Sequence, residues 1–384
     1  MHEERDTRRA LACVVEGGDP RLAALIARHG VAEVWRLVLA GATDPAWTAR
    51  ARALDLGSLL RAERRCSARF LIPGDPEWPE RLGDLEFCPE VQRLGGVPAG
   101  LWVRGERPLA DAVEASVSIV GSRASSSYGD RVATELADGL VAEGVSVVSG
   151  GAFGIDAAAH RGALAGGGPT VAFVAGGVDE PYPRTHAQLL ERVVEHGAVV
   201  SEYPPGERPT RYRFLARNRL IAAISQGTVI VEAAVRSGAR NTVTWASGCG
   251  RPVMAVPGPI GNVTSFTPHR LIREGEAVLV TGVADVRELI GPLGVVGDDR
   301  PRCARLFDTL DADQRAVLEA LPERGGRDAG EVALRAGVTV AAAFAALSEL
   351  AEAGLVTRRG DGLWRLGEFG NRPLVPVPGP ASER

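Results

Sequence analysis

Seven short apolar runs recur between residues 117 and 282, and the intervals between them carry apolar residues at helical spacing. Continuous apolar strands that alternate with helices are typical of a parallel sheet whose two faces are both covered. The sequence therefore predicts a doubly wound α/β domain. The runs are VSIV (117–120), VSVV (145–148), TVAFVA (170–175), AVVSEY (198–203), TVIVEA (228–233), PVMAVPG (252–258) and AVLVTG (277–282).

Helical patterns flank this domain. Before it, DPRLAALIARHGVAEVWRLV (19–38) is broken at Gly30, which fits a helix-hairpin-helix or, as we favour, ordinary bundle packing. A Pro/Gly-rich irregular bridge follows from residue 70 to residue 115. After the domain, three helical patterns (311–321, 328–336 and 339–353) and the basic hairpin GLVTRRGDGLWRL predict a winged helix.

We expect five segments in all. They are a helical domain at 1–72 (SAM-like or helix-hairpin-helix-like), an α/β domain at 73–292, a linker at 293–305, a winged-helix domain at 306–368 and a disordered tail at 369–384.

Composition narrows the classes of protein. The 384-residue chain has a net charge of −4, and all 44 basic residues are arginine because there is no lysine. The N-terminus has no signal-peptide core and no apolar run is long enough for a membrane helix, so we expect a cytoplasmic protein without a membrane span. The five scattered cysteines form no C-x-x-C pair. We therefore expect buried free thiols, and neither a zinc site nor a disulfide framework.

The segment VVSGGAFGIDAAAH (147–160) joins a strand end, a glycine turn and a helix start, which together favour phosphate binding. Ligands of open parallel sheets bind at these carboxyl ends, where the strand order reverses. The dinucleotide fingerprint is absent, and a P-loop is impossible without lysine. We therefore expect no nucleotide cofactor. The candidate phosphate-binding residues are Gly121, Ser122 and Arg123 after the first run and Ser149, Gly150, Gly151 and Gly154 after the second.

Acidic and histidine residues near these loops fit support better than catalysis. Asp156 and His160 are four residues apart on a helix, and two such residues without a third rarely bind a metal. We expect Asp156 to cap the helix and His160 to pack or bond to a nearby loop. Glu202 and Glu232 end strands and act either as acids or bases or as partners of nearby arginines. No nucleophile has a base at readable spacing, so we expect neither a metal site nor an enzyme.

The segment TRYRFLARNRLIAAIS (210–225) interleaves arginines with aromatic rings. Arg211, Arg213, Arg217 and Arg219 are candidates for phosphate contacts, and Tyr212 and Phe214 offer ring faces. Single-stranded nucleic acid is bound in this way, because cations follow the backbone while rings stack on bases.

Seven motifs in order resemble the DNA-processing protein A family, also called DprA or Smf. They are VGSR (120–123), SGGAFGIDAAAHRGAL (149–164), TVAFVAGGVDEPYPRTH (170–186), SEYPPG (201–206), FLARNRLIAAIS (214–225), VIVEAAVRSGARNTVTWA (229–246) and AVPG (255–258).

The resemblance implies an extended Rossmann domain that dimerises and binds single-stranded DNA without catalysis. Such a protein protects the strand and loads the RecA recombinase in recombination and transformation. By motif, Gly121, Ser122 and Arg123 would bind phosphate, the three loop glycines would line the same pocket, and Phe214, Arg217, Asn218 and Arg219 would flank it. The segment VTSFTPHRLI (263–272) departs from the family's usual Ser/Gly-rich turn.

Two other functions stay open at this point. One is an enzyme acting on a nucleoside monophosphate, and the other is a winged-helix regulator that senses a nucleotide. The third helix of the expected winged helix, TVAAAFAALSELAEAG (339–354), has no basic residue. Base reading in the major groove needs arginine or polar side chains, so we expect this module to bind duplex DNA poorly.

Overall fold

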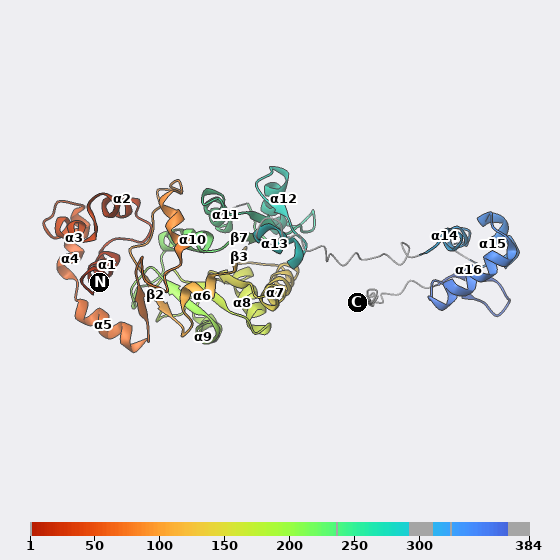
Figure 1. The fold of residues 1–384 in the computed structure, drawn as a ribbon, viewed down its shortest axis with the longest axis horizontal. Coiled ribbons are helices and arrows are strands. Elements are labelled where there is room, and N and C mark those ends of the chain that lie inside the picture. Colours follow the sequence, from red (N-terminus) through yellow and green to blue (C-terminus); the bar gives the residue numbers. More distant parts are fainter. Residues whose placement is uncertain (1, 236, 292–309, 323–324, 368–384) are drawn as a thin grey trace, which may run out of the picture. The chain divides into compact units, whose positions relative to one another are not determined.

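The computed structural model describes residues 2–235, 237–291, 310–322 and 325–367. The chain divides into two compact units, Met1–Gly297 and Asp298–Arg384 (Figure 1). Each unit is described separately below.

The first unit is built on a nine-stranded sheet in the order β1-β2-β6-β5-β4-β3-β7-β8-β9. The seven strands from β6 to β9 in this order run parallel to one another. They coincide with the seven apolar runs of the sequence. Their bounds are β3 (Ser116–Val120), β4 (Ser146–Ser149), β5 (Thr170–Phe173), β6 (Ala198–Ser201), β7 (Gly227–Ile230), β8 (Val253–Ala255) and β9 (Val278–Leu279).

Helices cover both faces of this sheet, as the continuous apolar runs predict. Successive strand residues point to opposite faces, so Val117 and Ile119 join one buried cluster while Val120 joins another. In Figure 1, α10 and α11 lie on one side of the strands and α7 and α8 on the other. The doubly wound α/β fold is therefore confirmed. The helices are α6 (Leu109–Val113), α7 (Ser127–Ala142), α8 (Ile155–Ala165), α9 (Ala187–His196), α10 (Arg211–Ile224), α11 (Ala239–Gly248), α12 (Phe266–Arg273) and α13 (Val283–Ile290).

Two further strands lie in the segment that the sequence predicts to be an irregular bridge, and that prediction is wrong there. β1 (Arg69–Leu71) and β2 (Leu101–Arg104) form an antiparallel pair, and β2 also pairs antiparallel with β6. Both strands are short and are bounded by proline and glycine, so neither shows a period on its own. The neighbouring strand β6 supplies the pairing that makes them part of the sheet.

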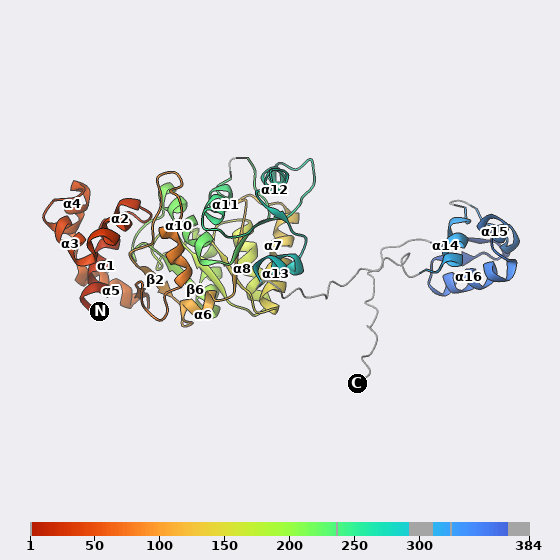
Figure 2. The same cartoon turned by 45° about the horizontal axis from the view of Figure 1, so that its top comes forward.

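The N-terminal region is helical, as expected, and it shares a core with the sheet. Leu11 and Val34 belong to the same buried cluster as Val199 of β6. The indole N–H of Trp102 in β2 donates to Glu63 Oε1 at 2.7 Å. Figures 1 and 2 show these helices grouped beyond β2. They are α1 (His2–Val14), α2 (Pro20–His29), α3 (Val31–Leu39), α4 (Pro45–Ala53) and α5 (Leu56–Arg65).

Among the described residues of the second unit, three helices are followed by a two-stranded antiparallel hairpin. These elements lie where the sequence predicts them; the winged-helix assignment itself stays a prediction. The predicted linker and tail lie outside the described residues. The elements are α14 (Ala312–Glu319), α15 (Ala329–Ala336), α16 (Val340–Glu352), β10 (Val356–Arg358) and β11 (Trp364–Leu366).

Across the part of the chain that the structure describes, no single helix is long and apolar enough to cross a membrane. Only α15 and α16 taken together reach that length and apolarity, and they meet at a bend of 105°.

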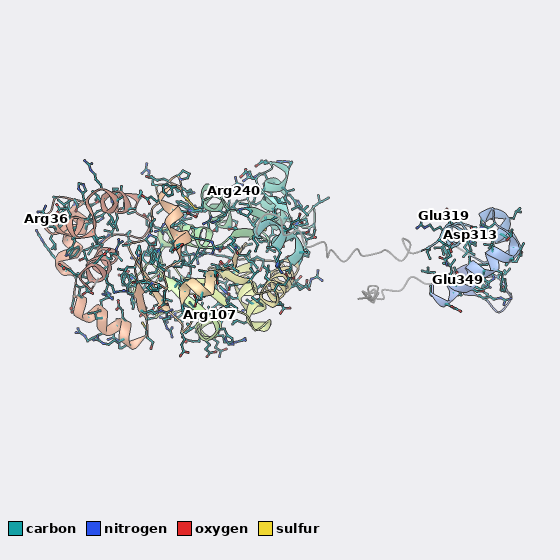
Figure 3. All side chains as sticks on the ribbon, viewed as in Figure 1. Arg36, Arg107, Arg240, Asp313, Glu319 and Glu349 are labelled. Carbon is teal, nitrogen blue, oxygen red and sulfur yellow. A yellow bond between two sulfur atoms is a disulfide. The ribbon has the colours of Figure 1, made fainter. Side chains whose placement is uncertain are left out.

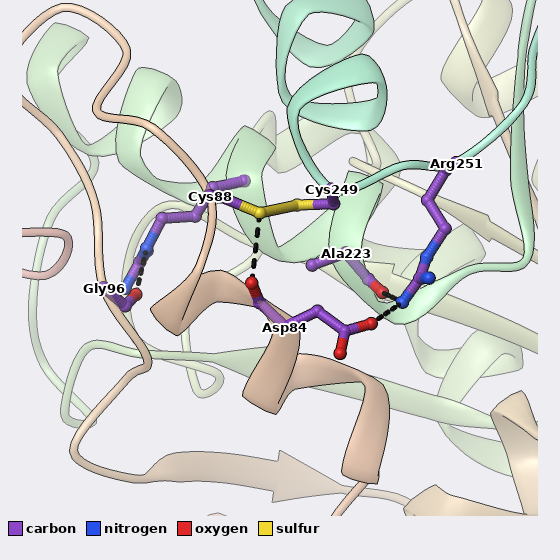
Figure 4. Close-up of a disulfide and its surroundings, with 7 residues drawn as sticks. Asp84, Cys88, Gly96, Ala223, Cys249 and Arg251 are labelled. Atoms are coloured by element: carbon purple, nitrogen blue, oxygen red, sulfur yellow. Dashed lines mark hydrogen bonds and ion pairs between the residues drawn. A yellow bond between two sulfur atoms is a disulfide. The ribbon is translucent and has the colours of Figure 1, made fainter.

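Two cysteines are paired, which corrects the expectation of free thiols. Cys88, two residues beyond the short helix η1 (Glu80–Glu86), forms a disulfide with Cys249, which directly follows α11 (Figure 4). They are 161 residues apart in sequence and meet only through the fold, so their spacing carries no signal. Cys13 and Cys66 are free and half-buried. The fifth cysteine, at position 303, lies outside the described residues.

Candidate nucleic-acid interface

The strand order reverses between β3 and β7, and a large cavity lies there. From β3 the chain proceeds to β4, β5 and β6 on one side, and then returns to β7 on the other. The loops after β3 and β7 therefore lead away in opposite directions. Open α/β sheets bind their ligands in the crevice between two such loops. The cavity has a volume of about 970 Å³. Of the residues named from the sequence, it is lined by Gly121, Ser122, Arg123, Asp156, Arg211, Phe214, Arg217 and Asn218.

The loop after β3 is held in place by Glu232, which is fully buried in the loop after β7. The Ser122 N–H donates to the Glu232 carbonyl oxygen at 2.6 Å. The Glu232 carboxylate accepts from the Ser126 N–H at 2.8 Å and from the Ser126 hydroxyl at 2.6 Å. All these contacts are internal, so Glu232 occupies a structural position at the start of α7.

Arg123 extends from this loop over an aromatic ring. Its guanidinium carbon lies 4.5 Å from the centre of the Phe214 ring, which α10 supplies. Arg123 is exposed, and within the described residues no carboxylate lies at ion-pairing distance from it. Tyr182, in the loop after β5, also approaches this ring, and the centres of the Tyr182 and Phe214 rings lie 5.6 Å apart. A free cation and two rings thus meet at the cavity.

Arg217 brings a second cation to the cavity, and this one is buried. Its guanidinium donates to the Gly150 carbonyl oxygen at 2.7 Å and also to the Phe173 carbonyl oxygen. Gly150 is required there, because a Cβ atom would lie 2.2 Å from Arg217 Nη1. Burial lowers the pKa of Arg217 to about 10, and the Asp156 carboxyl opposes this shift. The group is therefore still charged at neutral pH.

Within the described chain, no carboxylate forms an ion pair with Arg217. A buried cation without a paired anion is unfavourable by several kcal/mol in general. An anion that enters the cavity supplies the missing charge. The cavity is therefore suited to phosphate.

Asp156 does not cap its helix as expected, whereas His160 is fully buried, which is the first of the two placements expected for it. Gly154 is the N-cap residue of α8. Asp156 is the second residue of this helix, and its carboxylate accepts from the Ala152 N–H at 3.4 Å. Burial raises the pKa of the Asp156 carboxyl, and Arg217 opposes this. His160 bonds through Nδ1 to the Thr170 hydroxyl of β5 at 2.7 Å, so its partner is a strand and not a loop.

The glycine loop after β4 supports the cavity from below. Ser149 is buried, and its hydroxyl donates to the Ile119 carbonyl oxygen at 2.7 Å. Gly154 packs so closely on the loop after β3 that a Cβ atom would lie 2.2 Å from the Ser122 carbonyl oxygen. Of the segment 149–154, only Ala152 is among the lining residues. The lining residues therefore include neither the three glycines expected to line the pocket, Gly150, Gly151 and Gly154, nor Ser149, which was expected to bind phosphate.

Two of the four arginines expected to contact phosphate point away from the cavity. Arg219 is buried and forms a two-pronged ion pair with Glu202, at 2.6 and 2.7 Å. Arg213 pairs with Glu16 at 3.1 Å and with Glu207 at 2.6 Å. The helical period contributes: residues 211, 214, 217 and 218 lie within an arc of about 120° around α10, and 213 and 219 lie outside that arc, on its two opposite sides. Applying that period to the sequence would have separated them.

Several lining residues were missed by sequence reasoning. Asn241 of α11 accepts from the Asn218 amide at 3.2 Å, and Arg240 pairs with Glu276 at 2.7 Å. Among the missed residues, Tyr182 lies in the loop after β5, and Ser237, Arg240, Asn241 and Thr242 lie at or just before the start of α11. The signal that could have marked them is their place within the family motifs 170–186 and 229–246.

Within the described ranges, no three His, Cys, Asp or Glu side chains gather closely enough to hold a metal ion.

Comparison with known proteins decides the family. Residues 69–291 match the family model described as DNA recombination-mediator protein A. The chain belongs to this family. The family membership suggested by the sequence motifs is thereby confirmed, and it gives the chain a role in DNA processing and recombination.

Relatives of this family are similar over most of the chain. A putative DNA processing protein DprA from Mycobacterium tuberculosis is 45% identical over 305 residues, which are 79% of this chain and 78% of that protein. Protein Smf from Escherichia coli is 40% identical over 219 residues, 57% of this chain and 56% of that protein.

Solved structures from the family share the fold. The X-ray structure of DNA processing protein A from Streptococcus pneumoniae superposes with a TM-score of 0.60 and 30% identity, covering 73% of this chain and 95% of that one. A Helicobacter pylori structure, which concerns that protein's single-stranded DNA binding mode, has a TM-score of 0.50 and 24% identity. It covers 58% of this chain and 94% of that one, and the likeness is one of fold.

Proposed function

We propose that this chain is a non-catalytic single-stranded DNA-binding protein that protects the strand and loads the RecA recombinase onto it in the cytoplasm. The observation that carries the proposal is the cavity at the strand-order reversal, where Arg123, Arg217 and Phe214 meet. A cation beside a ring face suits a nucleotide, because phosphate and base are engaged together.

The polymer is favoured over a free nucleotide by the shape and charge of the site. The cavity of about 970 Å³ is open along α10 and α11, and the exposed Arg211 continues its positive charge beyond Arg217. The two strand-end acids are already engaged, Glu202 with Arg219 and Glu232 with the Ser126 segment. Neither is left free to act as an acid or base, which favours binding over hydrolysis.

Fluorescence anisotropy with a labelled oligothymidylate tests this proposal. Arg123→Ala and Phe214→Ala are each expected to weaken binding at least about tenfold, since one stacked base contributes roughly 1–3 kcal/mol. Wild-type affinity is expected to fall steeply with salt. Arg36→Ala is the matched control, because Arg36 is exposed on α3, where it pairs with Glu33 (Figure 3).

Two results would overturn the proposal. One is the lack of any oligonucleotide binding by the wild-type chain at low salt. The other is consumption of a nucleoside monophosphate that Glu232→Gln abolishes, which would identify an enzyme instead. A further arm measures RecA filament formation on strands coated with single-strand-binding protein, which the wild-type chain is expected to accelerate.

The proposal includes a homodimer formed through the α/β domain. β9 is the edge strand of the sheet, and its Val278 and Leu279 side chains are about half exposed. Near it, a second cavity of about 410 Å³ includes the exposed apolar residues Ile260 and Phe266. Sedimentation analysis is expected to find a dimer for the wild-type chain and a monomer for Val278→Asp. A wild-type monomer at micromolar concentration would refute this part.

We also propose the division at residues 72 and 292 and the winged-helix identity of 306–368. The side chains labelled in this unit in Figure 3 are acidic, and one of them is Glu349 of α16. The exposed basic residues of the hairpin are Arg358, Arg359 and Arg365. Weak binding of a labelled duplex by the full chain, unchanged by Arg358→Ala, is the expected result.

A further inference from the structure

Phe153 is an exposed ring in the middle of the glycine loop after β4. Its side chain is 49% exposed, although the residues on both sides of this loop are mostly buried. Sequence reasoning treated the loop as a phosphate wall and assigned this ring no role. Because the loop glycines pack against the interior, Phe153 is the residue of this loop that is available to a ligand at the surface.

The backbone holds this ring in a fixed place. Gly151 and Gly154 on either side of it have φ angles of +66° and +73°, which other residues rarely adopt. Gly154 is packed against the Ser122 carbonyl oxygen and Arg123, so the loop cannot shift without moving the phosphate-facing loop. Phe153 is therefore positioned relative to Arg123 by the fold itself.

One side of the ring is supported and the other is open. The His186 ring meets Phe153 at a centre-to-centre distance of 4.8 Å and an angle of 66°. His186 is buried and is itself fixed by a hydrogen bond between its Nδ1 and the Gly151 carbonyl oxygen, 3.1 Å away. A ring fixed from behind loses little conformational entropy when a flat ligand stacks on its free face.

The neighbours of Phe153 belong to the cavity. Ala152, the preceding residue, lines it, and so does Tyr182, which is 50% exposed and touches Phe214. Tyr182 and His186 belong to the same loop after β5, so this loop connects the two exposed rings. Phe153 is not itself a lining residue, but it directly follows the lining residue Ala152 and contacts His186, which lies four residues after the lining residue Tyr182.

We propose that Phe153 stacks on an unpaired base of single-stranded DNA that lies outside the cavity, next to the nucleotide held by Phe214 and Arg217. This inference rests on the proposed function and names a further part of the same site. A base is the favoured occupant because the ring adjoins a cationic, ring-bearing cavity, and stacking tolerates any base. The strand is then gripped at two successive positions, with the exposed Arg123 available to its backbone.

The test compares Phe153→Ala and Phe153→Trp with wild type. The alanine variant is expected to bind a labelled oligothymidylate about tenfold more weakly, whereas the tryptophan variant keeps wild-type affinity. Phe87→Ala is the matched control, since Phe87 is 83% exposed and directly follows η1, outside the loops after β3, β4 and β5. Thermal unfolding is expected to be unchanged in all three variants.

A second arm distinguishes stacking from a general change in the site. Competition by thymidine monophosphate, which fills only the inner position, is expected to be the same for wild type and Phe153→Ala. The added tryptophan fluorescence of Phe153→Trp, measured against wild type, is expected to be quenched when the oligonucleotide binds.

The outcomes separate this inference from the proposed function. If wild type fails to bind the oligonucleotide, the proposed function fails. If wild type binds and Phe153→Ala binds equally well, or the tryptophan is not quenched, the stacking role is refuted while the function stands. If Phe153→Ala binds DNA normally but no longer accelerates RecA filament formation, the ring serves a protein contact and the inference is again wrong.

Discussion

At the scale of single residues, Arg217 and Arg219 of α10 show how similar side chains take different tasks. Both are buried, but Arg219 is neutralised by Glu202, whereas Arg217 donates to carbonyl and amide oxygens, contacts the Phe214 ring and forms no ion pair with a described carboxylate. The charge of Arg217 is therefore left for a ligand. The charge of Arg219 is neutralised inside the protein by its ion pair with Glu202, and this contact fixes α10.

These two residues give a contrasting prediction. Arg217→Met is expected to weaken oligonucleotide binding at least about tenfold. It is also expected to make the fall of log affinity with log salt shallower, by about 0.7 in the slope. Arg219→Met is expected to leave that slope unchanged but to lower the free energy of unfolding by about 3–5 kcal/mol, because it leaves Glu202 buried and unpaired. Binding titrations at several salt concentrations and urea unfolding measure both. Equal salt slopes for wild type and Arg217→Met would contradict the assignment.

The buried His160 gives a prediction about pH. Burial lowers its pKa to about 3, well below its value in the unfolded chain. The unfolded chain therefore binds one more proton as pH falls below about 6.5, and stability is lost at up to about 1.4 kcal/mol per pH unit. His160→Asn, which cannot take up that proton, is expected to show a smaller loss of stability between about pH 6.5 and pH 4.5. His29→Asn, at an exposed site, should retain the wild-type pH dependence of urea unfolding.

At the scale of elements, the sequence allowed prediction of the strands that carry their own pattern. Each of the seven parallel strands is a continuous apolar run, because both faces are buried. β1 and β2 were missed because their structure is decided by pairing with each other and by the pairing of β2 with β6. On α10, composition suggested that all four arginines contact phosphate, whereas the orientation of the helix selects Arg211 and Arg217.

The disulfide between Cys88 and Cys249 joins two elements that border the cavity. Val91 and Gln92, shortly after Cys88, line the cavity, and so does the first half of α11, which ends at Cys249. Because the link closes a loop of 161 residues, Cys249→Ser is expected to lower the free energy of unfolding by about 2–4 kcal/mol under oxidising conditions.

Two controls accompany this measurement. Cys66→Ser changes a free, half-buried cysteine and is expected to have a much smaller effect. Wild type treated with a thiol reductant is expected to unfold like Cys249→Ser. Identical denaturant midpoints for oxidised wild type and Cys249→Ser would show that the link contributes nothing to stability.

At the scale of the whole molecule, the chain as a whole is acidic although its binding site is basic. The net charge is −4, yet the cavity combines Arg123, Arg211 and Arg217 with a carboxylate, Asp156, whose burial raises its pKa. Local charge and the strand-order reversal therefore matter more for the ligand than net charge does. The sequence predicted a site at the carboxyl ends of the strands, whereas the strand order that places it between β3 and β7, and the residues that line it, follow only from the folded structure.

The central claim is that single-stranded DNA occupies the cavity at the strand-order reversal. Photocrosslinking of an oligonucleotide that carries 5-bromodeoxyuridine, followed by mass spectrometry of the full chain, tests it most directly. The account predicts crosslinks to the aromatic residues of this site, Phe214, Tyr182 and Phe153. Crosslinks confined to the helices of residues 2–65 or to the unit after residue 298 would contradict it.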